Sequence, residues 1–127
     1  MNKRKVVLVV DDDAAMLKGV QRLLKLHGFD AALFDSVEAF QDYAGFDQAC
    51  CIVLDINLNG KSGIGLRRHL TASGITIPVI FITGNDSDAT RAAALDAGCI
   101  AYLTKPFLAK SLIDPIQEAA TDIGRLA

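Results

Sequence analysis

The chain has 127 residues, a length that fits a single domain with its own core. Hydrophobic residues make up 51% of it, which excludes an intrinsically disordered protein. The net charge is −2 and no basic stripe is visible, so direct nucleic-acid binding has little electrostatic support. No apolar run is long enough for a membrane span or a signal-peptide core, so we expect a cytoplasmic protein without membrane contact.

The remaining bulk features have ordinary explanations. The charged residues 3–5 are expected to be a solvated lead-in to the first strand. The three cysteines, Cys50, Cys51 and Cys99, fit neither a disulfide framework nor a zinc-binding spacing. We therefore expect them to be small buried hydrophobes in a reducing compartment.

Three apolar runs predict strands that are buried on both faces. They cover residues 6–10, 51–54 and 78–82, and they lack the alternation of a half-exposed strand. Two weaker runs, residues 30–34 and 100–103, predict strands at the edges of the same sheet.

A segment with helical spacing of its apolar residues follows each strand. The expected helices are residues 14–27, a short helix capped by Ser36, one from Ser62 to Gly74, one from Asp86 or Ser87 to Ala97, and residues 108–121. Pro115 should kink or interrupt the last helix unless its geometry is relieved locally. Gly65 costs its helix about 1 kcal/mol relative to Ala, and either close packing or local mobility would account for it.

Five strands that alternate with five helices predict an α/β fold with a parallel sheet and helices on both faces. The central and edge strands fit a doubly wound, flavodoxin-like sheet in the order 2-1-3-4-5. We expect residues 1–127 to form this one domain.

Polar residues follow the strands at the edge of the sheet where α/β folds bind ligands. They are Asp11 and Asp12 after the first strand, Asp55 after the third, Thr83 after the fourth and Lys105 after the fifth. Each has an ordinary explanation alone: a helix N-cap for the acids Asp11–Asp13, a cap for Thr83, a turn former for Asp55, and a surface charge for Lys105. Their joint placement on one edge favours a site.

The chemistry of this set points to phosphoryl transfer. Clustered carboxylates need a positive partner, and hard oxygen ligands suit Mg²⁺. A carboxylate kept ionised between a metal ion and Lys105 is a competent nucleophile, which makes Asp55 a candidate for an aspartyl phosphate. Thr83 and the backbone amide of Gly84 can donate hydrogen bonds to the transferred group.

Four motifs resemble those of one known family over essentially the whole chain. They are Val-Val-Asp-Asp at 9–12, Leu-Asp-Ile-Asn-Leu-Asn-Gly at 54–60, Ile-Thr-Gly at 82–84 and Tyr-Leu-Thr-Lys-Pro-Phe at 102–107. As a set they resemble the response-regulator receiver domain of two-component signalling, whose chemotaxis regulators have the fold predicted above. The motif style is similar to the receivers of helix-turn-helix transcription factors.

The resemblance implies roles for particular residues. Asp55 is implied as the phosphoacceptor, and Asp11, Asp12 and the Asn57 backbone carbonyl as further ligands of Mg²⁺. Thr83 and Lys105 are implied as phosphate contacts, with a cis peptide between Lys105 and Pro106. Thr83 and Tyr102 are implied as the switch, and Asn57 and Asn85 as the positions that tune dephosphorylation. Asn59-Gly60 departs from the frequent Pro-Gly turn, which puts the stiffness of that loop in doubt.

The resemblance also implies partners. A sensor histidine kinase is the phosphodonor, and the surface of the fourth helix, fifth strand and fifth helix contacts an output domain or a downstream protein. A homodimer formed on phosphorylation is left open. We expect a regulator that catalyses its own phosphorylation and dephosphorylation, not a turnover enzyme, and one that acts on transcription through an output domain absent from these residues.

Two alternatives stay open. One is a stand-alone receiver that acts by protein–protein contact, including a form that has lost phosphorylation. The other is a Mg²⁺-dependent phosphatase with an aspartyl phosphate intermediate, for which Asp11-Asp12-Asp13 is the candidate motif but a cap insertion is missing.

Overall fold

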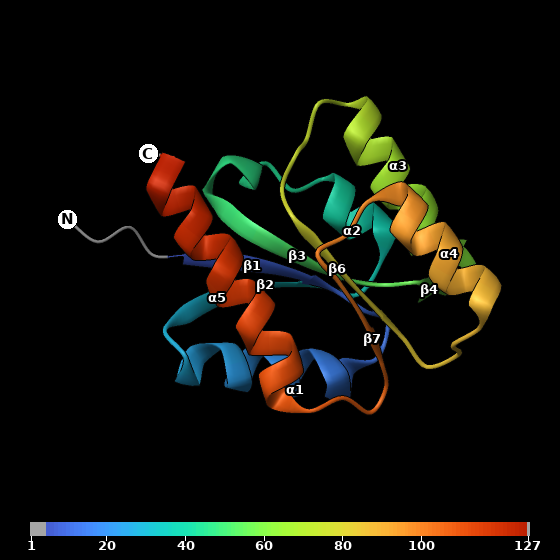
Figure 1. Cartoon of the computed structure of the whole chain (residues 1–127), viewed down its shortest axis with the longest axis horizontal. Coiled ribbons are helices and arrows are strands. Elements are labelled where there is room, and N and C mark those ends of the chain that lie inside the picture. The colour runs from blue at the N-terminus through green and yellow to red at the C-terminus, as the bar shows by residue number, and fades with distance from the viewer. Residues whose placement is uncertain (1–4, 127) are drawn as a thin grey trace.

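A five-stranded parallel sheet forms the centre of the molecule (Figure 1). The computed structural model describes the backbone of residues 5–126 and the side chains of residues 5–121, so Lys3 and Arg4 of the charged lead-in lie outside the described residues. The strands of the sheet are β1 (Lys5–Val10), β2 (Phe29–Phe34), β3 (Ala49–Asp55), β6 (Val79–Thr83) and β7 (Ala101–Thr104).

The strand order is β2-β1-β3-β6-β7. Since β6 and β7 are the fourth and fifth strands of this sheet along the chain, the predicted order 2-1-3-4-5 is confirmed. The weaker strands β2 and β7 lie at the edges, as their composition predicted. Every residue of β3 and of β6 is buried, because helices cover both faces of the sheet.

Three of the helices begin at serine caps that the sequence indicates. The helices are α1 (Ala14–Leu26), α2 (Val37–Gln41), the 3-10 helix η1 (Phe46–Gln48), α3 (Gly63–Ala72), α4 (Asp88–Ala97) and α5 (Ala109–Leu126). Ser36 and Ser62 cap α2 and α3, since each hydroxyl accepts a backbone N–H three residues on. Of the two candidates for α4, Ser87 is the cap. This leaves the Asp86 carboxylate free for other contacts.

Two apolar layers pack on the sheet. Helices α1 and α5 cover one face over Val9, Val53 and Ile82, and α2, α3 and α4 cover the other over Leu8, Ile52 and other buried residues (Figure 1). Cys50 and Cys51 are buried, as predicted, whereas Cys99 is only partly buried. Within the part of the chain that the structure describes, no helix has the length and the apolar character needed to cross a bilayer.

A small hairpin follows β3 that the sequence analysis did not predict. Strands β4 (Asn57–Leu58) and β5 (Lys61–Ser62) pair antiparallel around the Asn59-Gly60 turn. Both turn residues have positive φ, 52° and 82°, as a two-residue hairpin of type I′ requires. The turn itself was predicted, but pairs of two residues are too short to show as strands in a sequence.

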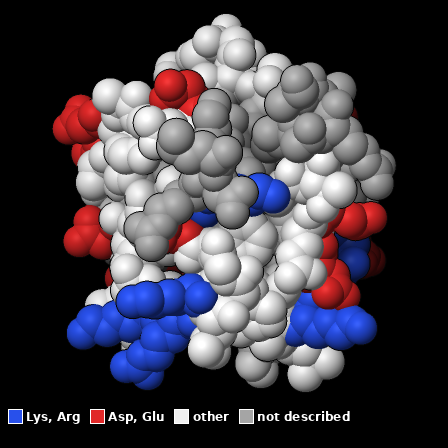
Figure 2. Space-filling view, turned by 90° about the vertical axis from the view of Figure 1, so that its left-hand side faces the viewer, with Lys and Arg blue, Asp and Glu red and all other residues white. Residues whose placement is uncertain are grey.

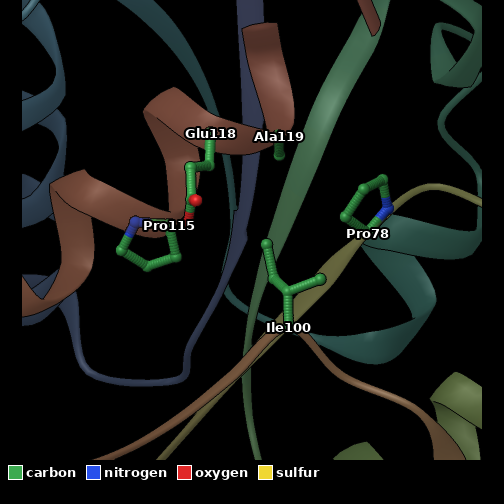
Figure 3. Close-up of a pocket in the computed structure, with 5 residues that line it drawn as sticks. All are labelled: Pro78, Ile100, Pro115, Glu118 and Ala119. Atoms are coloured by element: carbon green, nitrogen blue, oxygen red, sulfur yellow. The ribbon is translucent and has the colours of Figure 1, made fainter. Parts of the chain in front are cut away.

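Helix α5 runs through Pro115, so the predicted interruption is wrong. Proline removes one backbone N–H, and the carbonyl that it would have bound belongs to Ser111, an exposed residue that water can solvate. The Pro115 ring lines an open cavity of about 190 Å³ together with Pro78, Ile100 and two residues of the next turn of α5 (Figure 3). Because the ring faces this cavity, it does not disturb the core.

Candidate functional site

Asp11 and Asp55 lie side by side at the carboxyl ends of two neighbouring strands. Asp55 is the last residue of β3 and Asp11 follows β1, whose Val10 is paired with Leu54. Asp11 is 0% exposed and Asp55 is 4% exposed. The parallel register therefore places two buried carboxylates next to each other.

Asp12 completes an acidic cluster with these two residues. One carboxylate oxygen from each of Asp11, Asp12 and Asp55 lies within 4.8 Å of the others. Asp12 is exposed, so the cluster opens to solvent on its side. Three converging hard oxygen donors with an open side suit Mg²⁺, which keeps several of its waters.

Lys105 bridges the two buried carboxylates. Its Nζ donates to Asp55 Oδ2 at 2.9 Å and to Asp11 Oδ2 at 3.0 Å. The side chain reaches the cluster from the end of β7, after which the Lys105–Pro106 peptide bond is cis, as the resemblance implied. The Lys105 backbone N–H also donates to the Thr83 carbonyl at 2.8 Å.

Backbone N–H groups donate to three other carboxylate oxygens of the cluster. Asp55 Oδ1 accepts from Asn57 N at 3.0 Å, and Asp11 Oδ1 accepts from Asp13 N at 2.9 Å. Asp12 Oδ2 accepts from Asn59 N at 3.2 Å. Proline at position 59 would have no N–H to donate, so the Asn59-Gly60 turn supplies a contact that a Pro-Gly turn lacks.

Burial and pairing shift the pKa values of the site in a consistent way. Burial raises the pKa of Asp11, and hydrogen bonds from Asp13 and Lys105 offset this only in part. Burial lowers the pKa of Lys105, but its hydrogen bonds to Asp55 and Asp11 outweigh burial and leave that pKa raised. Lys105 is therefore a firmly charged ammonium group between acids.

Thr83 ends the neighbouring strand β6 and is fully buried. Its Oγ1 accepts the backbone N–H of Asn85 at 3.0 Å. Tyr102, further from the cluster in β7, donates its hydroxyl to Asp86 at 2.8 Å. The structure thus places Asp11, Asp12, Asp55 and Lys105 in one cluster, Thr83 at the adjacent strand end, and Tyr102 beside the loop that follows Thr83.

Gly63, a residue on which the site depends, was not predicted from the sequence. A Cβ at Gly63 would lie 2.1 Å from the Asp55 carbonyl oxygen, so only glycine fits there. Gly65, which was considered for close packing, has ordinary contacts at 3.6 Å with Ser62. A glycine directly after a helix cap was the available signal, because an isolated glycine can mark a close approach of two backbones.

Charges are mixed on the side of the molecule where β1 begins and α5 ends. Figure 2 shows Lys and Arg side chains there in separate groups, with Asp and Glu side chains beside them. Where this face is described, no continuous basic surface is present.

Comparison with known proteins identifies the class that this fold and site define. The family model of the response regulator receiver domain matches residues 7–117. The chain therefore belongs to the response regulator receiver domain family, which confirms the resemblance seen in its motifs.

Individual proteins support the same assignment. The chain is 33% identical over 118 residues to the response regulator protein TmoT of Ectopseudomonas mendocina, covering 93% of this chain and 54% of TmoT. It is 37% identical over 108 residues to the response regulator MprA of Mycobacterium avium, covering 84% of this chain and 47% of MprA. The solved structure of the response regulator StyR matches with a TM-score of 0.86 and 36% identity, over 96% of this chain and 62% of StyR.

Two conclusions follow from these matches. The chain is a module of two-component phosphoacceptor signalling, a regulatory role and not that of a classical enzyme. It spans about half the length of the curated relatives it matches.

Proposed function

We propose that Asp55 is the residue that accepts the phosphoryl group. The observation that carries this proposal is the contact of Lys105 Nζ with Asp55 Oδ2, at 2.9 Å, at the buried end of a central strand. Lys105 places a positive charge beside Asp55. This charge can neutralise phosphoryl oxygens while the carboxylate attacks. The proposed donor is a phosphohistidine of a sensor histidine kinase.

The transfer is a simple displacement at phosphorus. A carboxylate oxygen of Asp55 forms the new O–P bond while the P–N bond of the phosphohistidine breaks, and the imidazole leaves with the electron pair. Lys105 and the Thr83 hydroxyl would contact the oxygens of the transferred group. Hydrolysis by water returns the carboxylate and releases inorganic phosphate. The chain would therefore catalyse both its own phosphorylation and its dephosphorylation, with Asn57 and Asn85 at the edge of the site tuning the second step.

The residues present fit Mg²⁺. Asp11, Asp12 and Asp55 supply the clustered carboxylate oxygens, and the Asn57 backbone carbonyl would be the further protein ligand. When bound, Mg²⁺ neutralises charge on the phosphoryl oxygens. Lys105 and Mg²⁺ would then both offset the negative charge of the clustered carboxylates.

The proposed output is a change of surface around α4, β7 and α5. A phosphoryl group on Asp55 would draw the Thr83 hydroxyl toward it, and Tyr102 would move in response. This surface would then contact an output domain, a downstream protein or a second copy of the chain. We further propose that residues 1–127 act as one receiver whose output is on transcription, in the cytoplasm, where unpaired cysteines such as these three stay reduced.

Mass spectrometry after incubation with acetyl phosphate and Mg²⁺ tests the phosphoacceptor. We expect the mass of one phosphoryl group to be added to the wild-type chain, and none to Asp55→Asn or to the wild type in excess EDTA. Asp47→Asn is the matched control, because Asp47 is an exposed acid in η1 and should leave the adduct intact. An unmodified wild type, or an adduct that persists in Asp55→Asn, would contradict the proposal.

A further inference from the structure

Three side chains at the edge of the α4–β7 surface form a closed set of contacts. Asp86 Oδ1 accepts from the Tyr102 hydroxyl at 2.8 Å, and Asp86 Oδ2 accepts from Arg91 Nη2 at 3.1 Å. The Arg91 guanidinium also lies over the Tyr102 ring, 4.8 Å from its centroid. Each side chain thus touches the other two, and Asp86 holds both of its partners through separate oxygens.

These three residues come from three different elements. Asp86 belongs to the loop after β6, Arg91 to the first half of α4, and Tyr102 to β7, where it is paired with Phe81. Moving Tyr102 away from its present position therefore requires the Tyr102–Asp86 hydrogen bond to break. It also removes the ring from beneath the Arg91 guanidinium.

The loop that carries Asp86 is bound to the candidate site through Thr83. The Asn85 N–H donates to Thr83 Oγ1 at 3.0 Å, and Asp86 is the next residue. A Thr83 hydroxyl that turns toward a phosphoryl group would leave the Asn85 N–H without its acceptor. The backbone at Asn85 and Asp86 would then have to shift, and the carboxylate that holds Tyr102 would shift with it.

We propose that Asp86 is a positioning residue that latches Tyr102 and Arg91 in one of two arrangements of the α4–β7 surface, and that phosphorylation opens this latch through Thr83 and Asn85. The inference rests on the proposed function, since it names the device that regulates the same site. It assigns to Asp86 a role that the motifs did not single out.

The electrostatics agree with this geometry. Hydrogen bonds from Tyr102 and Arg91 lower the pKa of Asp86, so the carboxylate is charged at neutral pH. Burial and the contact with Asp86 raise the pKa of the Tyr102 phenol, so it stays a donor. Asp86 and Arg91 are 40% and 51% exposed, and exposed pairs contribute little, so the latch should be weak enough for one phosphoryl group to open.

The apparent affinity for a phosphoryl mimic is a direct test of the latch. If the latch favours the arrangement that binds phosphate less well, its removal raises the competent fraction and the apparent affinity by the same factor. We expect Asp86→Ala to bind beryllofluoride, in the presence of Mg²⁺, about three- to tenfold more tightly than the wild type by NMR titration. Tyr102→Phe, which removes only the hydroxyl, should have an effect of the same sign, and the double variant should gain no more than the stronger single variant.

Asp96→Ala is the matched control. Like Asp86, Asp96 is an exposed acid that pairs with an arginine, Arg68 at 3.2 Å, but it lies at the end of α4 that is opposite to the loop after β6. Its removal should leave the affinity for beryllofluoride at the wild-type value. An equal gain in Asp96→Ala would show a general charge effect and would overturn the latch.

A second readout does not depend on phosphorylation chemistry. In the protein without beryllofluoride, Asp86→Ala should change the NMR shifts of the Tyr102 ring, and Asp96→Ala should not. Unchanged shifts, or an unchanged or weaker affinity of Asp86→Ala for beryllofluoride beside normal binding by the wild type, would overturn the latch alone. Failure of the wild type and every variant to bind beryllofluoride would instead contradict the proposed function, and the coupling of the latch to it.

Discussion

At the scale of single residues, the geometry of Asp55 depends on a neighbour with no side chain. The Gly63 N–H donates to the Ile56 carbonyl at 2.7 Å, which draws the start of α3 against the end of β3. The missing Cβ of Gly63 is what permits this approach, since the Asp55 carbonyl oxygen occupies its place. The backbone of the candidate phosphoacceptor is therefore held by packing as well as by the sheet.

Replacing Gly63 by alanine should destabilise the protein. The new methyl group would meet backbone atoms, which cannot rotate away, so we expect a loss of about 1–3 kcal/mol in the free energy of unfolding measured with urea. Gly19→Ala is the control, because no atom lies within 4 Å of a Cβ at this exposed position of α1. Gly19→Ala should raise the free energy of unfolding by about 0.5–1 kcal/mol. Equal effects of the two substitutions would contradict the role given to Gly63.

At the scale of elements, one arginine of α3 joins three segments. Arg67 Nε donates to the Gly98 carbonyl at 3.0 Å and Arg67 Nη1 donates to the Ile77 carbonyl at 3.3 Å. Gly98 ends α4, and Ile77 precedes β6. Arg67 thus fixes the end of α4 opposite to the loop that carries Asp86, which leaves movement to the other end of the helix.

Arg67→Ala and Arg68→Ala should differ although they neighbour each other in one helix. Loss of Arg67 leaves two partly buried carbonyls without their charged donor, and should lower the free energy of unfolding by about 1–2 kcal/mol. Arg68 makes one exposed ion pair with Asp96, so its removal should change the value by roughly 0.5 kcal/mol or less. Urea unfolding of both variants measures the difference, and a larger loss for Arg68→Ala would refute this account of the link.

At the scale of the whole molecule, the fold buries acidic side chains at one edge of the sheet, which is unfavourable for their charged forms. Its two apolar layers hold the strand ends in register, and this register brings Asp11 and Asp55 together in a buried place. The raised pKa of Asp11 means that folding is opposed by ionisation of this group. The clustered acids that the proposed chemistry requires therefore lower the stability of the folded protein.

Asp11→Asn should therefore stabilise the protein in the absence of magnesium. Below the ordinary pKa of 3.8 the carboxyl is neutral in both the folded and the unfolded chain, so the substitution should have little effect there. As pH rises through the raised folded pKa, the wild type loses stability that the variant keeps. Thermal melts at pH 7 should show a Tm about 3 °C or more higher for the variant, as roughly 1 kcal/mol gives in a domain of this size. A gain that is as large at pH 3.5 as at pH 7 would contradict the assignment to Asp11.

Much of the fold and of the candidate site could be predicted from the sequence. Unbroken apolar runs end in polar residues at 11, 55 and 83, and alternation with helices is sufficient to predict a parallel sheet with those ends on one edge. The runs that are apolar throughout indicated the central strands, and this partition fits the strand order 2-1-3-4-5, a common doubly wound pattern. Asp11, Asp12, Asp55 and Lys105 were predicted to converge because parallel strands align their carboxyl ends, and the structure places them together.

Only the tertiary structure decided the contacts that depend on distance between segments. The close approach of Gly63 to Asp55, the Asn59 N–H on Asp12, and the set formed by Asp86, Arg91 and Tyr102 all join residues through space, in ways that no periodicity encodes. The continuity of α5 through Pro115 was also settled there, because it depends on whether water can reach the Ser111 carbonyl that the proline leaves without its donor. Local patterns determine which residues reach the edge of the sheet, whereas packing between elements determines how they are held once there.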